Sequence, residues 1–315
     1  MRIARIKYRG GGAFYHVMNR TAGTHQDRPF GPVEQEMFVK LLHKVQRFYT
    51  VEVVSYTVMS NHWHAVIHVP CALPSEEEAV RRYNSYYEGK RQIDAEVPDI
   101  EEIRARMIDF SCMVRDLQQS FTIWFNRTRK ITRRGRLWAD RFKSVLLDGK
   151  ASLWTCIKYI ELNSVRAGIV ENPADYRFCS WGVWNGSGKH PFGRAFFKYV
   201  KCSLGERARH WSVAEVADEL RADIARTMEA ARKDATGDTV KAAYDEAKRK
   251  PAIQLVASRR VRYWTDGAVI GSKLFVQQVA TEMYGEDRAK QRRYGTGELP
   301  EGGKLFSLRC LREQT

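Results

Sequence analysis

The stretch VEVVSYTVMSNHWHAVIHVP, residues 51–70, decides the fold class because it reads as two strands joined by a tight turn. Residues 51–59 and 62–69 are rich in β-branched and aromatic side chains, and Ser60-Asn61 offers the turn of a hairpin. Side chains alternate along a strand, so His62 and His64 lie on one face of the second strand. The hairpin therefore predicts a sheet that presents two imidazoles side by side.

The segments around this hairpin predict an α+β domain. Upstream, residues 13–19 (AFYHVMN) resemble a strand, and residues 33–48 carry apolar side chains at helical spacing. Downstream we expect a helix capped by Ser75, a long helix ending near Arg127, an extended segment over 137–147 and a shorter helix over 152–165. The order β, α, β, β, α, β followed by one more helix is that of a split βαβ, ferredoxin-like antiparallel sheet.

Composition favours a folded, basic protein of the cytoplasm. The chain has 315 residues, 43% of them hydrophobic, and no apolar run approaches the roughly 20 residues that would span a bilayer. Neither a signal-peptide core nor a CxxC pair among its six cysteines is present. The net charge of +16 attracts polyanions, of which nucleic acid is the commonest in the cytoplasm. Charge of this kind is shared with ribosomal and RNA-binding proteins.

Two domains are expected. Residues 1–185 contain the predicted sheet and its helices, whereas residues 185–190 (NGSGKH) resemble a linker. Residues 207–250 are rich in Ala, Glu and Arg, and residues 259–285 are expected to add another helical element. The sequence thus predicts a mainly helical, basic extension over 186–315 that binds DNA and adds affinity rather than chemistry.

Two pairs of residues are candidates for chemistry. His62 and His64 could share one metal ion, although a His-x-His pair is also compatible with a surface or a hydrogen-bonded core. Tyr159 and Asn163 are spaced four apart on one helix face, and the apolar residues Leu153, Ile157 and Ile160 gather roughly opposite. This spacing predicts a tyrosine directed away from the apolar side; a partly exposed tyrosine beside a solvated amide is the plainer alternative.

The third candidate is the basic stretch over residues 127–143, RTRKITRRGRLWADRFK. It interleaves Trp138 and Phe142 with cationic side chains, a combination suited to phosphates and unstacked bases, although a solvated basic loop would look the same. The predicted DNA contacts are Arg127, Arg129, Lys130, Arg133, Arg134, Arg136, Trp138, Arg141 and Lys143.

Taken together, these segments resemble the REP-associated tyrosine transposases, a single-tyrosine family with an HUH motif (His, hydrophobic residue, His). VMSNHWHAVIHVP resembles that motif, and YIELNSVRAGIVENPADYRFCSW, residues 159–181, is similar to the segment that carries the family's nucleophile. RLWADRFKSVLL, YHVMNR and RYWTDGAVIGSKLFV resemble the strand before it, the first strand and the tail of longer members. Ser164 departs from the proline usual after the asparagine, and Thr21-Ala22 departs from the residues usual after Arg20.

The resemblance implies an HUH nuclease fold and cleavage and rejoining of single-stranded or hairpin DNA, such as repeated palindromes. It implies that Tyr159 attacks the phosphate to give a 5′-phosphotyrosine, and that His62 and His64, with Asn163 as a third ligand, hold Mg²⁺ or Mn²⁺. Arg20 and Arg166 would contact DNA. The oligomeric state is open between a monomer and a homodimer.

Two rival functions remain at this point. A domesticated protein of the same fold would bind DNA hairpins without cutting them, although His62, His64, Tyr159 and Asn163 are all present. An RNA-binding ferredoxin-like protein would display an aromatic KGFGFVxF-like strand, and the sequence contains no such segment.

Overall fold

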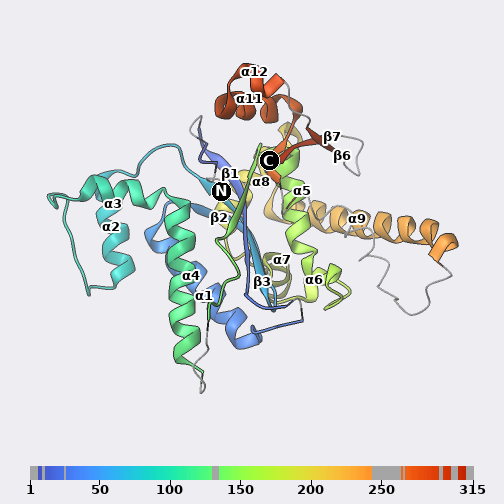
Figure 1. Cartoon of the computed structure of the whole chain (residues 1–315). Coiled ribbons are helices and arrows are strands. Elements are labelled where there is room, and N and C mark those ends of the chain that lie inside the picture. The colour runs from blue at the N-terminus through green and yellow to red at the C-terminus, as the bar shows by residue number, and fades with distance from the viewer. Residues whose placement is uncertain are drawn as a thin grey trace. The chain divides into compact units, whose positions relative to one another are not determined.

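The structure is a computed structural model that describes residues 6–8, 11–24, 26–129, 135–242, 264, 267–290, 294–298 and 304–309. It has a mixed α+β architecture made of two compact units (Figure 1). The N-terminal unit is Tyr8–Lys143, and the C-terminal unit consists of Ser144–Thr315 together with Met1–Lys7. The division between units therefore falls well before residue 185, where the sequence analysis places a domain boundary.

The N-terminal unit is built on β1 (Ala13–Arg20), β2 (Glu52–Val58) and β3 (His62–Val69). The strand β3 lies between the other two and pairs antiparallel with both. Helix α1 (Pro32–Phe48) connects β1 to β2, so β3 is inserted into a βαβ crossover. This part of the predicted sheet, including the β2–β3 hairpin, is confirmed.

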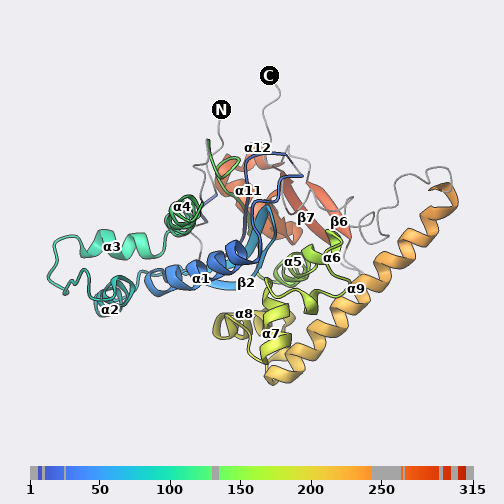
Figure 2. The same cartoon turned by 90° about the horizontal axis from the view of Figure 1, so that it is seen from below.

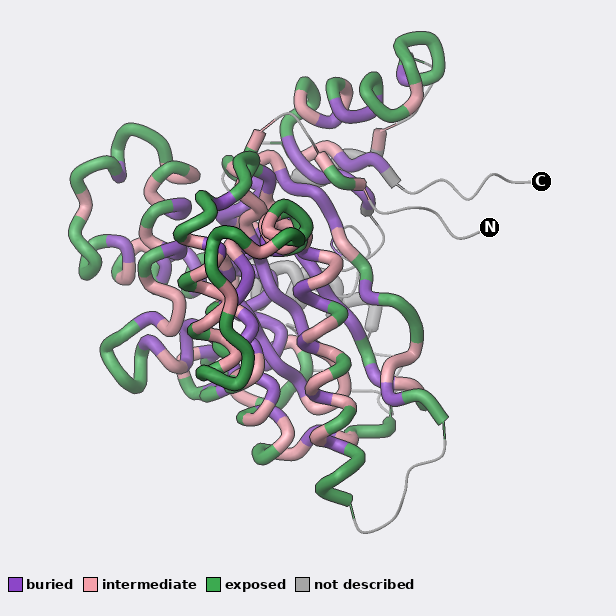
Figure 3. The backbone as a smooth tube through the Cα atoms, turned by 90° about the vertical axis from the view of Figure 1, so that its left-hand side faces the viewer, coloured by how far each residue is buried: buried purple, intermediate pink, exposed green. Residues whose placement is uncertain are grey.

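Helices cover one face of these strands. Phe38 of α1 contacts Trp63 of β3 with ring centroids 5.3 Å apart, and Phe110 of α4 (Phe110–Arg127) stacks on Tyr15 of β1 at 4.5 Å. Because side chains alternate, Trp63 faces this helical layer while its neighbours His62 and His64 point to the opposite face. Figure 3 shows that buried residues concentrate along the strands, whereas the helices alternate between buried and exposed positions.

The predicted long helix ending near Arg127 is confirmed over Phe110–Arg127, but Met107 belongs to a separate, shorter helix. The chain forms α2 (Glu76–Tyr87), capped as predicted by Ser75, and then α3 (Ile100–Met107) and α4. Asp109 separates the last two because its side chain accepts a hydrogen bond of 2.8 Å from the Ser111 backbone and caps α4. Apolar residues continue at helical spacing across this break, so the sequence pattern does not indicate where α3 ends and α4 begins.

The C-terminal unit contains strands that the sequence analysis missed. They are β5 (Gly267–Gly271), β6 (Gly295–Glu298) and β7 (Lys304–Arg309), whereas β4 (Lys143–Leu147) is shorter than the predicted extended segment. β5 pairs parallel with β4 and antiparallel with β7, and β7 pairs with β6. Over its described residues, the region after residue 185 is mainly helical, as predicted, but it also adds β5, β7 and β6 beside β4.

Figure 2 shows the helices of this unit; those over residues 180–187 and 193–204 were not predicted, and the first of them runs into the segment interpreted as a linker. The predicted helix over 152–165 is divided at Leu162. Residues 243–250, 259–263 and 265–266, for which helix was expected in part, lie outside the described residues. The helical elements are α5 (Ala151–Glu161), α6 (Asn163–Arg166), η1 (Pro173–Asp175), α7 (Ser180–Ser187), α8 (Gly193–Leu204), η2 (Glu206–Ala208), α9 (Val213–Ala242), α11 (Lys273–Tyr284) and α12 (Glu286–Lys290). Over the described ranges, no helix is both long and apolar enough to cross a membrane.

A buried imidazole should make this unit sensitive to acid. His190 stacks on Phe196 with ring centroids 4.1 Å apart, and burial lowers its pKa from 6.5 to about 3. Between these two values the unfolded chain binds a proton that the folded chain does not, so stability falls as pH decreases through this window. We expect the free energy of unfolding to lose up to about 1.4 kcal/mol per pH unit below pH ~6 through this residue.

The measurement is denaturant unfolding of the wild type and of His190→Gln over this pH range. The variant should show a shallower dependence on pH, whereas replacing the exposed His210 with Gln should leave the slope unchanged. Equal slopes in the wild type and in His190→Gln would contradict the assignment.

Candidate active site

The two histidines of β3 lie side by side, as the strand spacing predicts. Their ring centroids are 5.2 Å apart and their planes are nearly perpendicular. The Nδ1 atom of His62 lies 2.7 Å from Oδ1 of Asn61, and Nδ1 of His64 lies 2.9 Å from Nε2 of His16 on β1. In both rings, therefore, the nitrogen nearer the backbone is engaged within the sheet.

This arrangement fits a metal-binding pair. Ligating imidazoles in proteins usually hydrogen-bond through one nitrogen to a neighbouring group and coordinate through the other. Coordination by His62 and His64 would accordingly use their Nε2 atoms. Within the described ranges, no three His, Cys, Asp or Glu side chains form a metal-binding group.

Basic residues gather at the same end of the N-terminal sheet. Arg20 is exposed and pairs with His62 across β1 and β3, so the two side chains share a face. The backbone of residues 137–139 joins the end of β1, through Ala22 N to Leu137 O at 2.8 Å and Ala139 N to Arg20 O at 3.0 Å. The exposed residues Arg136 and Arg141 flank this segment and therefore lie near Arg20 at the end of β1.

The remaining residues of the predicted basic stretch have mixed placements. Arg127 and Lys143 are exposed, and Lys130, Arg133 and Arg134 lie outside the described residues. Arg129 donates to Glu34 at 2.8 Å and covers the Phe125 ring, so its guanidinium joins α4 to the start of α1.

The two aromatic side chains of this stretch pack within the N-terminal unit, Phe142 buried and Trp138 half-buried. The Trp138 indole donates to Thr122 Oγ1 at 3.0 Å and packs edge-on against Phe30. Phe142 is only 6% exposed and meets Phe110, so the expectation that its ring stacks on unpaired bases is wrong. Trp138 and Phe142 are interleaved with charged residues because both rings pack against α4.

Tyr159 is held more tightly than the sequence suggested. It lies on α5, whose first turn is fixed by Asp148: Oδ1 of Asp148 accepts hydrogen bonds from Ser152 Oγ at 2.6 Å and from Lys150 N at 3.1 Å. The Tyr159 side chain is 8% exposed and stacks on Trp264 with centroids 5.6 Å apart. The expectation of a side chain directed away from the apolar surroundings is thus wrong, because residues far along the chain cover that helix face.

Arg166 joins the two predicted site residues of this unit. Its guanidinium lies over the Tyr159 ring at 3.8 Å from the centroid, donates to the Tyr159 carbonyl at 3.1 Å, and donates to Oδ1 of Asn163. Nδ2 of Asn163 in turn donates to Ile160 O at 3.2 Å. Although the helix breaks at Leu162, Tyr159 and Asn163 are therefore brought together through one cation.

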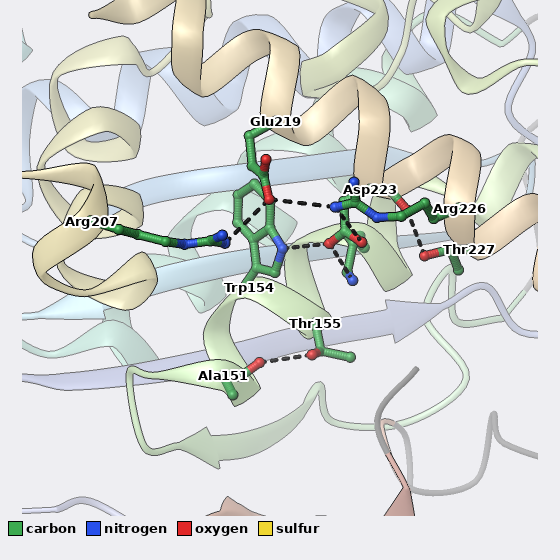
Figure 4. Close-up of polar contacts among 9 residues, drawn as sticks. Ala151, Trp154, Thr155, Arg207, Glu219, Asp223, Arg226 and Thr227 are labelled. Carbon is green, nitrogen blue, oxygen red and sulfur yellow. Dashed lines mark hydrogen bonds and ion pairs between the residues drawn. The ribbon is translucent and has the colours of Figure 1, made fainter. Parts of the chain in front are cut away.

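A buried polar cluster anchors α5 to α9, a helix that follows residue 185 in the sequence (Figure 4). Asp223 of α9 accepts a hydrogen bond of 2.6 Å from the Trp154 indole and lies 2.5 Å from Nζ of Lys158. Lys158 and Asp223 are both almost completely buried. Beside this contact, the half-buried Glu219 pairs with the exposed Arg207 at 3.2 Å.

These contacts give residues 186–315 a structural part in the C-terminal unit. Trp264, Asp223 and β5 all come from that region, and they pack on Tyr159, pair with Lys158 and extend β4 respectively. We no longer expect residues 1–185 to form a catalytic fragment by themselves. DNA binding by residues 186–315 remains a prediction.

The comparisons with known proteins add little to this geometry. No protein-family profile matches the chain, and no curated protein matches it either. Among solved structures, the chain is similar to "Structure of the REP associates tyrosine transposase bound to a REP hairpin", with 19% sequence identity, a TM-score of 0.40, and coverage of 61% of this chain and 90% of that chain. A similarity of this size establishes neither the family nor the activity of this chain.

Sequence reasoning missed three residues of the candidate site. His16 and Trp264 contact His64 and Tyr159 across separations of 48 and 105 positions, and no local pattern encodes such contacts. Asn61 was interpreted as a turn residue, although its side chain also contacts His62. The position of Asn61 directly before the His-x-His pair was the one signal available.

Proposed function

We propose that the chain cuts and rejoins single-stranded or hairpin DNA through a tyrosine nucleophile assisted by a divalent metal. The observation that carries the proposal is the imidazole pair on β3, in which Nδ1 of His62 and of His64 is engaged within the sheet. Two imidazoles oriented in this way can coordinate a divalent ion through Nε2, and the ion in this proposal is Mg²⁺ or Mn²⁺. When bound, the ion would polarise the scissile phosphate and stabilise charge on the leaving oxygen.

In the covalent step of this proposal, Tyr159 is the nucleophile. Its phenolic oxygen would attack phosphorus and the 3′ oxygen would leave, so that a 5′-phosphotyrosine bond forms as the phosphate bond to the 3′ oxygen breaks. The phenol loses its proton and the departing 3′ oxygen gains one. Because a phenolate is a good leaving group, a 3′-OH can attack the phosphotyrosine and rejoin the strand without an added energy source.

The remaining side chains would position these groups and the DNA. Asn163 would supply an amide oxygen as third ligand; an amide oxygen has two lone pairs, so its hydrogen bond from Arg166 is compatible with that role. Arg20, beside His62 on the same sheet face, would bind a phosphate. The imidazole pair belongs to one unit and Tyr159 with Asn163 to the other, so their use in one active site is itself part of the proposal.

A protein of this kind that binds DNA hairpins without cutting is the second candidate. The burial of Tyr159 under Trp264 and Arg166 favours it, because a nucleophile has to reach phosphorus. A suicide substrate that traps the covalent adduct separates the two functions. An adduct supports the first, and hairpin binding with no adduct and no strand cleavage supports the second.

The metal role predicts that His62→Ala or His64→Ala lowers Mg²⁺- or Mn²⁺-dependent cleavage by at least about a hundredfold, while hairpin affinity changes little. The measurement is cleavage of a labelled single strand alongside a binding titration. His68→Ala is a matched control, because His68 lies on the same strand face but pairs with Glu52 at 3.4 Å. Full cleavage by either alanine variant, or by the wild type in excess EDTA, would contradict the metal role.

A further inference from the structure

A third histidine lies against the imidazole pair and has no role in the proposed reaction. His16 on β1 is completely buried, and its Nε2 lies 2.9 Å from Nδ1 of His64. The two rings are nearly parallel, with an interplanar angle of 21° and centroids 5.0 Å apart. The contact joins two strands of the sheet across 48 positions of sequence.

We propose that His16 is a positioning residue that holds His64 in the Nδ1–H tautomer, so that the Nε2 lone pair of His64 is directed to the divalent ion. The inference rests on the proposed metal role of His64. The contact requires that one nitrogen of the pair donates and the other accepts. If His16 Nε2 accepts, His64 carries its proton on Nδ1 and coordinates through Nε2.

The other proposed ligand, His62, is held in the same tautomer that we propose for His64. Oδ1 of Asn61, an acceptor, lies 2.7 Å from Nδ1 of His62, so this ring also carries its proton on Nδ1. Two ligands with the same tautomer present the same type of nitrogen on one face of β3. The opposite arrangement, with His16 donating, would give His64 a proton on Nε2 and prevent that nitrogen from binding a metal.

Two variants separate this role from packing. In His16→Gln the amide oxygen lies as many bonds from Cβ as Nε2 does and can accept the same hydrogen bond, whereas His16→Phe keeps a ring of similar shape and removes the acceptor. We expect His16→Phe to weaken Mn²⁺ binding about 10- to 100-fold and His16→Gln to stay within a few-fold of the wild type. Mn²⁺ affinity is measured by electron paramagnetic resonance or calorimetry on the full chain without DNA, and thermal unfolding in EDTA reports any loss of stability.

The tautomer is measured directly, without metal, from the ring ¹⁵N chemical shifts above the ordinary imidazole pKa of about 6.5. We expect His64 to carry its proton on Nδ1 in the wild type and in His16→Gln, and to shift toward the Nε2–H form in His16→Phe. His62, held by Asn61, should keep its tautomer in all three proteins and serves as an internal control.

The Mn²⁺ affinity and the tautomer measurement together distinguish failure of this inference from failure of the proposed function. A wild-type His64 already in the Nε2–H form, or equal Mn²⁺ affinity in His16→Phe and the wild type, would overturn the role of His16. If the tautomers behave as expected but the wild type binds no Mn²⁺ that His62→Ala or His64→Ala removes, the hydrogen bond is present and the metal function fails, and with it the purpose assigned to His16.

Discussion

Replacing Tyr159 with phenylalanine is expected to abolish the covalent protein–DNA adduct while fold and hairpin binding survive. The substitution removes only the hydroxyl, and the ring that stacks on Trp264 and lies under the Arg166 guanidinium is retained. Without the phenolic oxygen no bond to phosphorus can form, so the loss should be complete within detection. Wild-type protein incubated with a suicide substrate should give an adduct that maps to the Tyr159 peptide.

Tyr176→Phe is the matched control, because Tyr176 is similarly buried in the same unit and packs on Phe178. It should form the adduct at the wild-type level. An adduct with Tyr159→Phe would place the nucleophile at another residue. Cleavage by the wild type that never leaves an adduct would indicate hydrolysis by activated water instead of strand transfer.

The second large effect is expected at the buried ion pair between α5 and α9. Lys158→Met should lower the free energy of unfolding by about 3 kcal/mol, because it leaves the Asp223 carboxylate buried without its nearest cation. Asp223→Asn should cost a similar amount, since Lys158 then loses its partner while the amide oxygen can still accept from Trp154. Denaturant unfolding of both variants provides the measurement.

The double variant Lys158→Met/Asp223→Asn tests the cause, because it buries neither charge and should recover much of the lost stability. Lys290→Met removes an exposed pair with Glu286 on α12 and should cost less than about 1 kcal/mol. Additive losses in the double variant would show that the two side chains act independently, against the pairing. Adduct formation should fall with stability in the single variants, since Lys158 directly precedes Tyr159.

The local parts of the fold could be predicted from sequence. The β2–β3 hairpin, α1 and the Ser75 cap follow from alternation, helical spacing and capping chemistry, which act over a few residues. The shared face of His62 and His64 follows from the same alternation. The break at Asp109 was missed because the apolar pattern of α3 and α4 is continuous across it.

The contacts that complete the candidate site could not be predicted, because they depend on strand order and on distant packing. His16 reaches His64 only because β1 pairs with β3 in one register, and Asp223 reaches Lys158 only because α9 packs on α5. The burial of Tyr159 has the same origin. From α5 alone its face opposite Leu153 and Ile157 looked exposed, but Trp264, about a hundred positions later, covers it.

Trp63, between the two histidines, helps to specify the register of β3. A strand that paired one residue out of step would place the indole in water and carry both imidazoles toward Phe38 and the helical layer. Exposing a tryptophan and burying polar rings without partners both cost free energy, so the misaligned pairing is penalised twice. The register that buries Trp63 is therefore the same register that places His62 and His64 on the opposite face. Replacing Trp63 with a small or polar residue would weaken the preference for this register and, with it, the presentation of the imidazoles.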